Sequence, residues 1–286
     1  MKRQKSFDDE SKAALYLIPT PIGNMQEISP RILQTLQDMD VIACEDTRNS
    51  GMLLHRLNIS KPLISHHEHN TQTAVPKILS LLEEGKKVGV ISDAGYPVIS
   101  DPGAYLAQQA IEHGYSVIPM SGPNAALNAL VASGLDAKHY LYYGFLDAKS
   151  KKRKDQLSAL KELPYTILFY EAPHRIEDML KDVKEVLGDR QICLAREITK
   201  LHEEFLRGNV SEILEVCSGL KGEMVVVVAG ASPSEHALTM SEACQMVADL
   251  IEEGIKTKDA CKQIAAKTGF SKNDLYNLYL TSKDQD

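Results

Sequence analysis

The residues of this chain that could do chemistry lie in two kinds of loop, one rich in Gly and Pro and one rich in charges. Residues 92–103 read Ser-Asp-Ala-Gly-Tyr-Pro-Val-Ile-Ser-Asp-Pro-Gly and follow the apolar, β-prone run Val88–Ile91. The loop therefore follows a predicted buried strand, at the sheet edge where open α/β sheets bind ligands. Its two Gly, two Pro and two Asp impose an unusual backbone path. We expect it to line a ligand site.

Two further loops at predicted strand ends, 19–24 and 120–125, are also rich in Pro and small residues. Such residues let backbone amides and carbonyls approach a ligand. A single loop of this kind is better explained as a tight turn, but three at one edge of a sheet favour a ligand. The sequence has neither Gly-x-Gly-x-x-Gly nor the Gly-Lys-Ser/Thr of a P-loop, which excludes those two nucleotide-binding fingerprints.

Charged side chains follow two strands predicted in the second half of the chain. Tyr170-Glu-Ala-Pro-His-Arg175 ends one strand, Ala195-Arg-Glu-Ile-Thr-Lys200 ends the next, and Glu203 and Glu204 follow. Such a convergence at strand ends predicts a reacting or substrate-orienting site. A surface ion-pair network explains any single one of these residues equally well.

Strands and helices alternate along the chain, and this pattern places those loops. The predicted strands are 15–18, 41–44, 63–64, 88–91, 116–118, 141–145, 166–170, 192–195 and 224–229. Their alternation with helices predicts parallel sheets with helical crossovers, and residues 202–207 are a candidate antiparallel strand. We predict a flexible arm over 1–12, an N-terminal α/β domain over 13–136, a C-terminal α/β domain over 137–232 and a helical extension over 237–286.

Composition limits the class of protein. The 286 residues carry a formal charge of −7, and no apolar run approaches the ~18 residues of a membrane span. The charged start lacks the apolar core of a signal peptide. The five scattered Cys form no Cys-x-x-Cys, which predicts neither disulfides nor a zinc site and fits the cytoplasm. The acidic balance argues weakly against nucleic acid, but residues 149–154 contain five basic residues. This run is either an RNA contact or a solvated linker.

Five motifs occur in a fixed order and carry a family resemblance. They are 20–24 (Thr-Pro-Ile-Gly-Asn), 45–48 (Glu-Asp-Thr-Arg), the loop 92–103, 170–176 (Tyr-Glu-x-Pro-His-Arg-Ile) and 196–204 (Arg-Glu-x-Thr-Lys-x-x-Glu-Glu). In this order they resemble the small-subunit ribosomal RNA methyltransferase I family of the tetrapyrrole methylase superfamily. Each motif alone is moderately specific, whereas the ordered set is very specific.

The resemblance implies a fold and an activity. It implies two α/β domains with S-adenosylmethionine in the cleft between them, in a homodimer. It implies methylation of the ribose 2′-hydroxyl of a cytidine in the decoding centre of 16S rRNA, on the assembled small ribosomal subunit. Two other functional classes stay open: a small-molecule methylase acting on a tetrapyrrole, and a non-catalytic RNA-binding protein.

The resemblance also assigns cofactor-binding residues, from the three small-residue loops and from the second domain. These are Pro19, Ile22, Gly23, Gly95, Tyr96, Ile99, Ser121, Gly122, Asn124, Ala125, Phe145, Leu146, Ala229 and Gly230. The sequence departs from the superfamily pattern in two places, because Tyr96 stands where the superfamily has Asp and Asn124 where it has Ser. We expect the opening loop to act through its backbone, with Tyr96 either stacking on a ring or pointing away.

Methyl transfer from a sulfonium needs an aligned nucleophile in a pocket that excludes water. A ribose hydroxyl is a poor nucleophile until a base assists the loss of its proton, although alignment alone could also suffice. The candidate catalytic residues are Glu171, His174, Glu197 and Lys200. The candidate RNA-binding residues are Arg48, Lys151, Lys152, Arg153, Lys154, Arg175 and Arg196.

Two segments remain ambiguous in the sequence. The His-rich loop 65–70 invites a metal hypothesis, but its histidines are adjacent rather than spaced along one helical face. We predict no metal there, and instead Asn70 as a helix cap beside solvated histidines. The last part of the tail, residues 255–283, carries six Lys against two Asp. It either contacts rRNA in a helix-turn-helix-like unit or packs as a helical cap.

Overall fold

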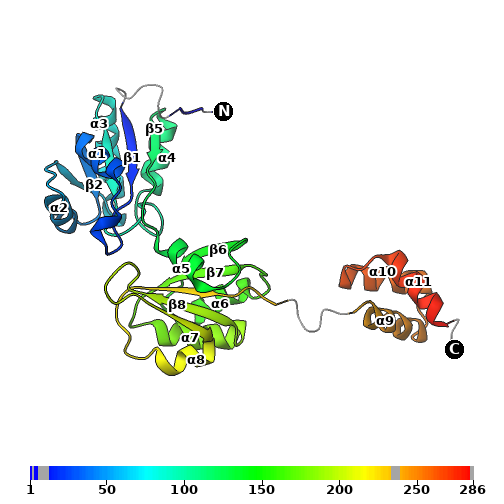
Figure 1. Cartoon of the computed structure of the whole chain (residues 1–286). Helices are drawn as coiled ribbons and strands as arrows, with labels where there is room; N and C mark the ends of the chain where they lie inside the picture. The colour runs from blue at the N-terminus through cyan, green and yellow to red at the C-terminus, as the bar shows by residue number, and fades with distance from the viewer. Residues whose placement is uncertain (2, 6–12, 233–238, 284–286) are drawn as a thin grey trace. The chain divides into compact units, whose positions relative to one another are not determined.

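The computed structural model describes residues 1, 3–5, 13–232 and 239–283. Most of the arm expected over 1–12, and both ends of the expected extension over 237–286, lie outside the described residues. The chain forms two compact units, 1–230 and 231–286 (Figure 1). No helix in the described part of the chain is long and apolar enough to cross a membrane.

The first sheet of unit 1 is entirely parallel, as the alternation of strands and helices predicts. Its order is β3 (Leu63–Ser65), β2 (Val41–Cys44), β4 (Val88–Ile91), β1 (Ala14–Ile18) and β5 (Ser116–Pro119). The connections contain α1 (Pro30–Asp38), α2 (Thr47–Arg56), α3 (Thr71–Glu83) and α4 (Ala104–Glu112), with short 3-10 turns η1 (Met25–Glu27) and η2 (Glu68–Asn70).

Both faces of this sheet are covered, because side chains along a strand alternate between its two faces. Val88 and Val90 of β4 pack with Ile78 of α3 on one face. Ile91 packs on the other face with Ile32 of α1. A strand buried on both sides is apolar throughout, which is why these strands stand out in the sequence.

The second sheet is mixed. Its order is β6 (Tyr140–Phe145), β7 (Thr166–Glu171), β10 (Met224–Val228), β8 (Gln191–Arg196) and β9 (Glu204–Asn209). β6 runs parallel to β7, whereas β10 runs antiparallel to β7 and β8. β9 is also antiparallel to β8, so the antiparallel strand expected over 202–207 exists but begins two residues later. The helices α6 (Ser150–Leu160), α7 (Ile176–Leu187) and α8 (Val210–Val216) cover one face.

The other face of the second sheet is covered by α5 (Ala125–Ser133). This helix follows β5 of the first sheet, but its Ala126, Ala129 and Leu130 pack against Leu168 and Val225 of the second. Small side chains let the helix approach the sheet closely. α5 therefore joins the two halves of unit 1, and the domain boundary expected at 136/137 stays a prediction.

Unit 2 consists of α9 (Met240–Glu252), α10 (Thr257–Thr268) and α11 (Lys272–Lys283), the three helices that the sequence predicts. Thr239 and Glu242 form a reciprocal capping box at the start of α9. Val247, Ile264 and Leu275, one from each helix, meet in a core of their own. Unit 2 thus has the hydrophobic core that a small three-helix domain needs.

Candidate functional site

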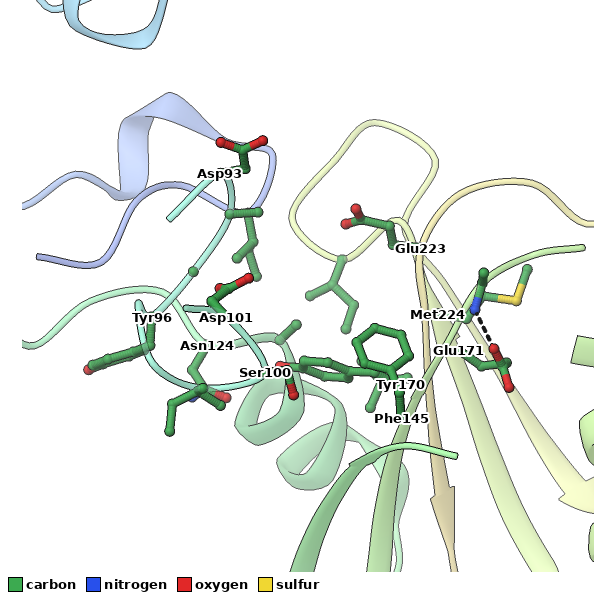
Figure 2. A pocket seen from close by; sticks show the side chains of 18 of the residues that line it. Asp93, Tyr96, Ser100, Asp101, Asn124, Phe145, Tyr170, Glu171, Glu223 and Met224 are labelled. Carbon is green, nitrogen blue, oxygen red and sulfur yellow. Dashed lines mark hydrogen bonds between the residues drawn. The ribbon is translucent and has the colours of Figure 1, made fainter. Parts of the chain in front are cut away.

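A pocket of about 340 Å³ opens at the carboxyl ends of β4 and β7 (Figure 2). That volume lies within the range of small-molecule sites. Both halves of unit 1 contribute to the lining. The predicted site residues that line it are Ile22, Gly95, Tyr96, Ile99, Asn124, Ala125, Phe145, Glu171, Glu197 and Lys200.

The three small-residue loops are bound to one another. Thr20 and Gly95 exchange backbone hydrogen bonds of 2.9 and 3.1 Å, and Thr20 Oγ1 donates to Ser92 O at 3.0 Å. Gly122 lies so close to Pro19 that a Cβ at Gly122 would be 2.3 Å from Pro19 Cγ. The loops thus form one rigid wall, and a side chain at 122 would force two of them apart.

Tyr96 fastens the second loop to the third, since Gly122 N–H donates to Tyr96 Oη at 2.9 Å. The ring lines the pocket while the hydroxyl points into the wall. Asn124 also has a structural task, because its side chain accepts from Leu127 N at 2.8 Å and caps α5. Both residues that depart from the superfamily pattern therefore stabilise the pocket loops through hydrogen bonds to backbone amides.

Four non-glycine residues in two facing pocket loops adopt positive φ: Val98 (78°), Ser100 (61°), Glu197 (50°) and Thr199 (69°). Each such residue costs about 1–3 kcal/mol and persists only when its surroundings enforce it. Ser100 Oγ lies 2.6 Å from Tyr142 Oη of β6, a contact that holds the first of these loops against the second sheet. Strain of this kind gathers at functional sites.

The pocket wall is acidic. Glu197 is paired with Lys200 at 2.9 Å, whereas Asp93, Asp101 and Glu223 add negative charge to the lining and form no ion pair among the described residues. Such a wall favours a cationic ligand.

Asp101 lines the pocket but is not among the site residues predicted from the sequence. Burial, and then the charges of Glu45, Asp93 and Glu223, raise the pKa of Asp101 to about 6. The signal available in the sequence was the second Asp of the loop 92–103. Its position in the pocket depends on the path of that loop, which composition does not specify.

An aromatic group from the second sheet forms another part of the lining. Tyr170 and Phe145 meet edge to face at 5.6 Å between ring centroids, and Tyr142 meets Tyr170 at 5.3 Å. Burial raises the pKa of Tyr170, so its phenol stays protonated. Aromatic rings can stack on a flat ligand or attract a cation through their faces.

Several predicted cofactor residues lie away from the lining. Leu146 is buried in the core of the second sheet, and Ser121 is exposed outside the pocket. Ala229 and Gly230 lie at the opposite sheet edge, next to Pro164. Their assignment is wrong because β10 runs antiparallel, so its beginning and not its end reaches the pocket. Pro19, Gly23 and Gly122 support the loops without lining it.

The predicted catalytic residues differ in their surroundings. His174 is exposed and does not line the pocket. Glu171 is fully buried, accepts from Ala172 N at 2.8 Å and lies 3.0 Å from Arg175 Nε. Burial raises the pKa of Glu171. Arg175 also donates to Leu146 O at 2.7 Å, so this pair braces the start of α7.

The basic run on α6 is mostly engaged within the protein. Arg153 is 3% exposed and donates to Asp182 Oδ2 at 2.7 Å, so its assignment to RNA binding is wrong: a buried, paired guanidinium cannot reach a phosphate. Lys154 lies 2.6 Å from Glu185, and Lys152 lies 3.8 Å from Asp147. Lys151 is exposed.

The three other arginines proposed for RNA binding also have carboxylate neighbours, and Arg175 is the one described above beside Glu171. Arg196 is paired with Glu204 across β8 and β9. Arg48 contacts Asp46 at 3.2 Å but keeps 87% of its side chain exposed. Arg48 is therefore the best placed of the three to meet a phosphate.

The His-rich loop is structured by Asn70. Its side chain accepts from His67 N at 2.9 Å and donates to Ser65 O at 3.0 Å. Asn70 holds the N-cap position of α3, as expected, but its side chain makes no capping hydrogen bond there because the amide is already used within the loop. His66 is buried, not solvated, and burial lowers its pKa. Within the described ranges no three His, Cys, Asp or Glu side chains gather as a metal site would require.

Comparisons with known proteins identify relatives of the whole chain. The family model described as Tetrapyrrole (Corrin/Porphyrin) Methylases matches residues 14–214, and the model described as RsmI C-terminal HTH domain matches 239–283. The chain is 41% identical to ribosomal RNA small subunit methyltransferase I of Bacillus subtilis (strain 168), over 98% of both chains. It is 42% identical to the protein of that name from Escherichia coli O157:H7, over 98% of this chain and 99% of the relative.

Solved structures share the fold of unit 1. Uroporphyrin-III-C-methyltransferase from Thermus thermophilus matches with a TM-score of 0.56 and 19% identity, over 76% of this chain and 94% of that one. The methyltransferase CobJ matches with a TM-score of 0.59 and 17% identity, over 77% and 95%. At these identities the likeness concerns the fold alone.

Proposed function

The chain belongs to the tetrapyrrole methylase family, in its small-subunit ribosomal RNA methyltransferase I branch, and from this premise we propose its reaction. It transfers a methyl group from S-adenosylmethionine to the ribose 2′-hydroxyl of a cytidine in 16S rRNA, on the assembled small subunit. It acts in the cytoplasm as a homodimer. The observation that carries the proposal is the pocket, whose acidic and aromatic lining suits a sulfonium cofactor.

The residues present fit that cofactor. Its sulfonium is a cation, and Asp93, Asp101 and Glu223 give the lining negative charge. Its adenine is a flat ring system, and Ile22 and Phe145 offer apolar surface in the lining against which such a ring can pack. The backbone of loop 92–103 would supply amides and carbonyls to its polar groups.

The protein's part in the reaction is to bind, align and exclude water. When bound, the cofactor supplies an electrophilic methyl group. The wall of three joined loops holds one side of the pocket rigid, and the loop 197–200 closes the other through the Glu197–Lys200 pair. Lys200 also packs over Gly23, where a Cβ would lie within 2.4 Å of Lys200 Cγ. The loop 197–200 therefore contacts the wall of three joined loops at Gly23.

Unit 2 offers a surface for RNA. Lys258 and Lys262 lie one turn apart on α10, both are exposed, and neither contacts a carboxylate among the described residues. Lysines on an exposed helix face bind phosphates as point charges. Together with Arg48, Lys151 and the other exposed lysines of α10, they are the RNA contacts we propose.

A tetrapyrrole substrate is the second candidate, favoured by the fold neighbours alone. Those structures cover about three quarters of this chain, whereas the relatives with the ribosomal name cover 98%. The segment matched by the RsmI C-terminal HTH domain model, residues 239–283, carries the exposed lysines of α10. A tetrapyrrole is small and needs no such surface.

A three-substrate assay tests the proposal. The purified protein is incubated with labelled S-adenosylmethionine and one of three acceptors: unmodified small subunits, protein-free 16S rRNA, or a tetrapyrrole precursor. We expect label in the small subunits. Label in the tetrapyrrole alone would refute the proposal, and no transfer together with no cofactor binding would favour a non-catalytic RNA-binding protein.

Two aromatic residues of β6 provide a matched pair for the cofactor site. Phe145 lines the pocket and is 51% exposed, while Tyr140, 44% exposed, begins the same strand and does not line it. Loss of an aromatic contact costs about 1.5 kcal/mol, so Phe145→Ala should weaken cofactor binding about tenfold in calorimetry. Tyr140→Ala should leave it unchanged, and equal effects would place the cofactor elsewhere.

A further inference from the structure

The carboxyl groups of Asp101 and Glu223 differ from the other carboxyl groups of the lining in having no hydrogen-bond or ion-pair partner among the described residues. Glu197 is paired with Lys200, Glu171 accepts from Ala172 N, and Asp93 accepts from Asn49 Nδ2 at 2.9 Å. No hydrogen bond or ion pair to the Asp101 side chain is found among the described residues. The carboxyl is half-buried and lies in the lining, next to Ser100 on the loop (Figure 2).

The loop that carries Asp101 is held in a strained path. Val98 and Ser100 both have positive φ, and Ser100 Oγ is fixed to Tyr142 Oη at 2.6 Å. Gly144 of β6 makes room for this contact, since a Cβ there would lie 3.1 Å from Ser100 Oγ. A side chain positioned by so constrained a backbone is preorganised for one task.

The charged groups that raise the pKa of Asp101 are all negative, while Lys200 of the same lining is paired with Glu197. Glu45 follows β2, Asp93 follows β4, and Glu223 precedes β10. With burial they raise the pKa of Asp101 to about 6. The phenols of Tyr142 and Tyr170 lie nearby and stay neutral, because burial raises the pKa of both. At pH 7 the carboxylate is therefore mostly ionised but more basic than an ordinary Asp, as a general base should be.

We propose that Asp101 is the general base that takes the proton of the target ribose 2′-hydroxyl, an inference that rests on the proposed function. The ribose oxygen forms its bond to the methyl carbon while its O–H bond breaks, and the proton moves to a carboxylate oxygen of Asp101. The electron pair of the broken carbon–sulfur bond stays on sulfur, which becomes a neutral thioether. The protonated Asp101 returns its proton to solvent after product release.

The test is the pH dependence of single-turnover methyl transfer to unmodified small subunits between pH 5 and 8.5. For the wild type we expect the rate to fall tenfold per pH unit below about pH 6. Asp101→Asn should lose about 100-fold or more in rate at saturating S-adenosylmethionine and lose this acidic limb of the pH profile. Its affinity for S-adenosylmethionine in calorimetry should fall no further than that of Glu223→Gln, which removes the same charge from the lining. Asp101→Glu should restore the limb at a reduced rate.

Glu223→Gln is the matched control, because it removes one carboxylate from the same lining. It should keep the acidic limb but move its midpoint to lower pH, since Glu223 contributes to the raised pKa of Asp101. A wild-type limb that persists in Asp101→Asn, or a limb that Glu223→Gln does not move, overturns the proposal. So does loss of cofactor binding in Asp101→Asn but not in Glu223→Gln, which would make Asp101 a direct cofactor contact. A wild type that binds the cofactor but transfers nothing to the subunits would instead refute the proposed function.

Discussion

Tyr96 holds two loops of the pocket together through a hydroxyl oxygen that accepts from Gly122 N–H. The sequence marks this position as a departure from the superfamily pattern but does not show which way the ring points. Only the folded positions of loops 92–103 and 120–125 bring the hydroxyl and the amide together. The same holds for Asp101, whose place in the lining follows from a strained backbone and not from its neighbours in sequence.

Tyr96→Phe should loosen the wall of the pocket. It leaves the partly buried Gly122 N–H without its acceptor, which costs about 1–2 kcal/mol. We expect that loss in urea unfolding, together with weaker cofactor binding. Tyr105→Phe, at an exposed tyrosine of α4, is the control and should be neutral. Equal stabilities of the two variants would contradict the structural role of the Tyr96 hydroxyl.

Asp101→Asn should change the pH dependence of folding stability. The pKa of Asp101 is raised from 3.8 to about 6 in the folded protein, so its protonated form favours folding below pH 4 and this contribution is lost as pH rises through 6. The variant should therefore match the wild type near pH 4 and exceed it in stability above pH 6. Urea denaturation at several pH values measures this, and a difference that does not change with pH would contradict it.

At the scale of elements, strands buried on both faces were the easiest to predict. Val88–Ile91 is apolar throughout, and the helices beside such strands are marked by Ser29 before Pro30 or by Gly134 at a C-terminus. Strand direction was harder, because period and composition are the same for parallel and antiparallel strands. Because β10 was expected to be parallel, Ala229 and Gly230 at its end were predicted to reach the pocket. β10 is antiparallel, so its beginning reaches the pocket instead.

Arg153 shows that a run of basic residues in the sequence does not reveal which of its side chains are exposed. In sequence it belongs to a basic run, but helical periodicity turns it inward to Asp182 while Lys151 faces solvent. Arg153→Met should leave Asp182 with a poorly compensated buried charge and cost about 3 kcal/mol in urea unfolding. The double variant Arg153→Met/Asp182→Leu should recover much of this loss. No recovery would mean that packing, and not charge, is what Arg153 supplies.

The exposed lysines of α10 should matter more for RNA than those of α6. The double variant Lys258→Gln/Lys262→Gln is tested by measuring subunit binding at several salt concentrations. If both lysines bind phosphates, the slope of log affinity against log salt concentration should become shallower by about 1.5. Lys151→Gln/Lys152→Gln removes the same number of charges from α6 and should lower it less, because Lys152 already has Asp147 as a neighbour. A larger effect of the α6 pair would reverse this assignment.

At the scale of the whole molecule, the chain combines a two-sheet unit that forms the pocket with a helical unit that has its own core and exposed lysines. The first supplies the chemistry we propose, and the second offers contacts to a large polyanionic substrate. Neither property alone distinguishes a ribosomal RNA methyltransferase from a tetrapyrrole methylase or an RNA-binding protein, whereas the combination does.

The most direct test of that account is to identify the methylated nucleoside. Small subunits lacking the modification are incubated with the protein and labelled S-adenosylmethionine, and their 16S rRNA is digested to nucleosides and separated. We predict that the label elutes with 2′-O-methylcytidine. Label on a base, or in no nucleoside at all while the protein binds its cofactor, would contradict the central claim.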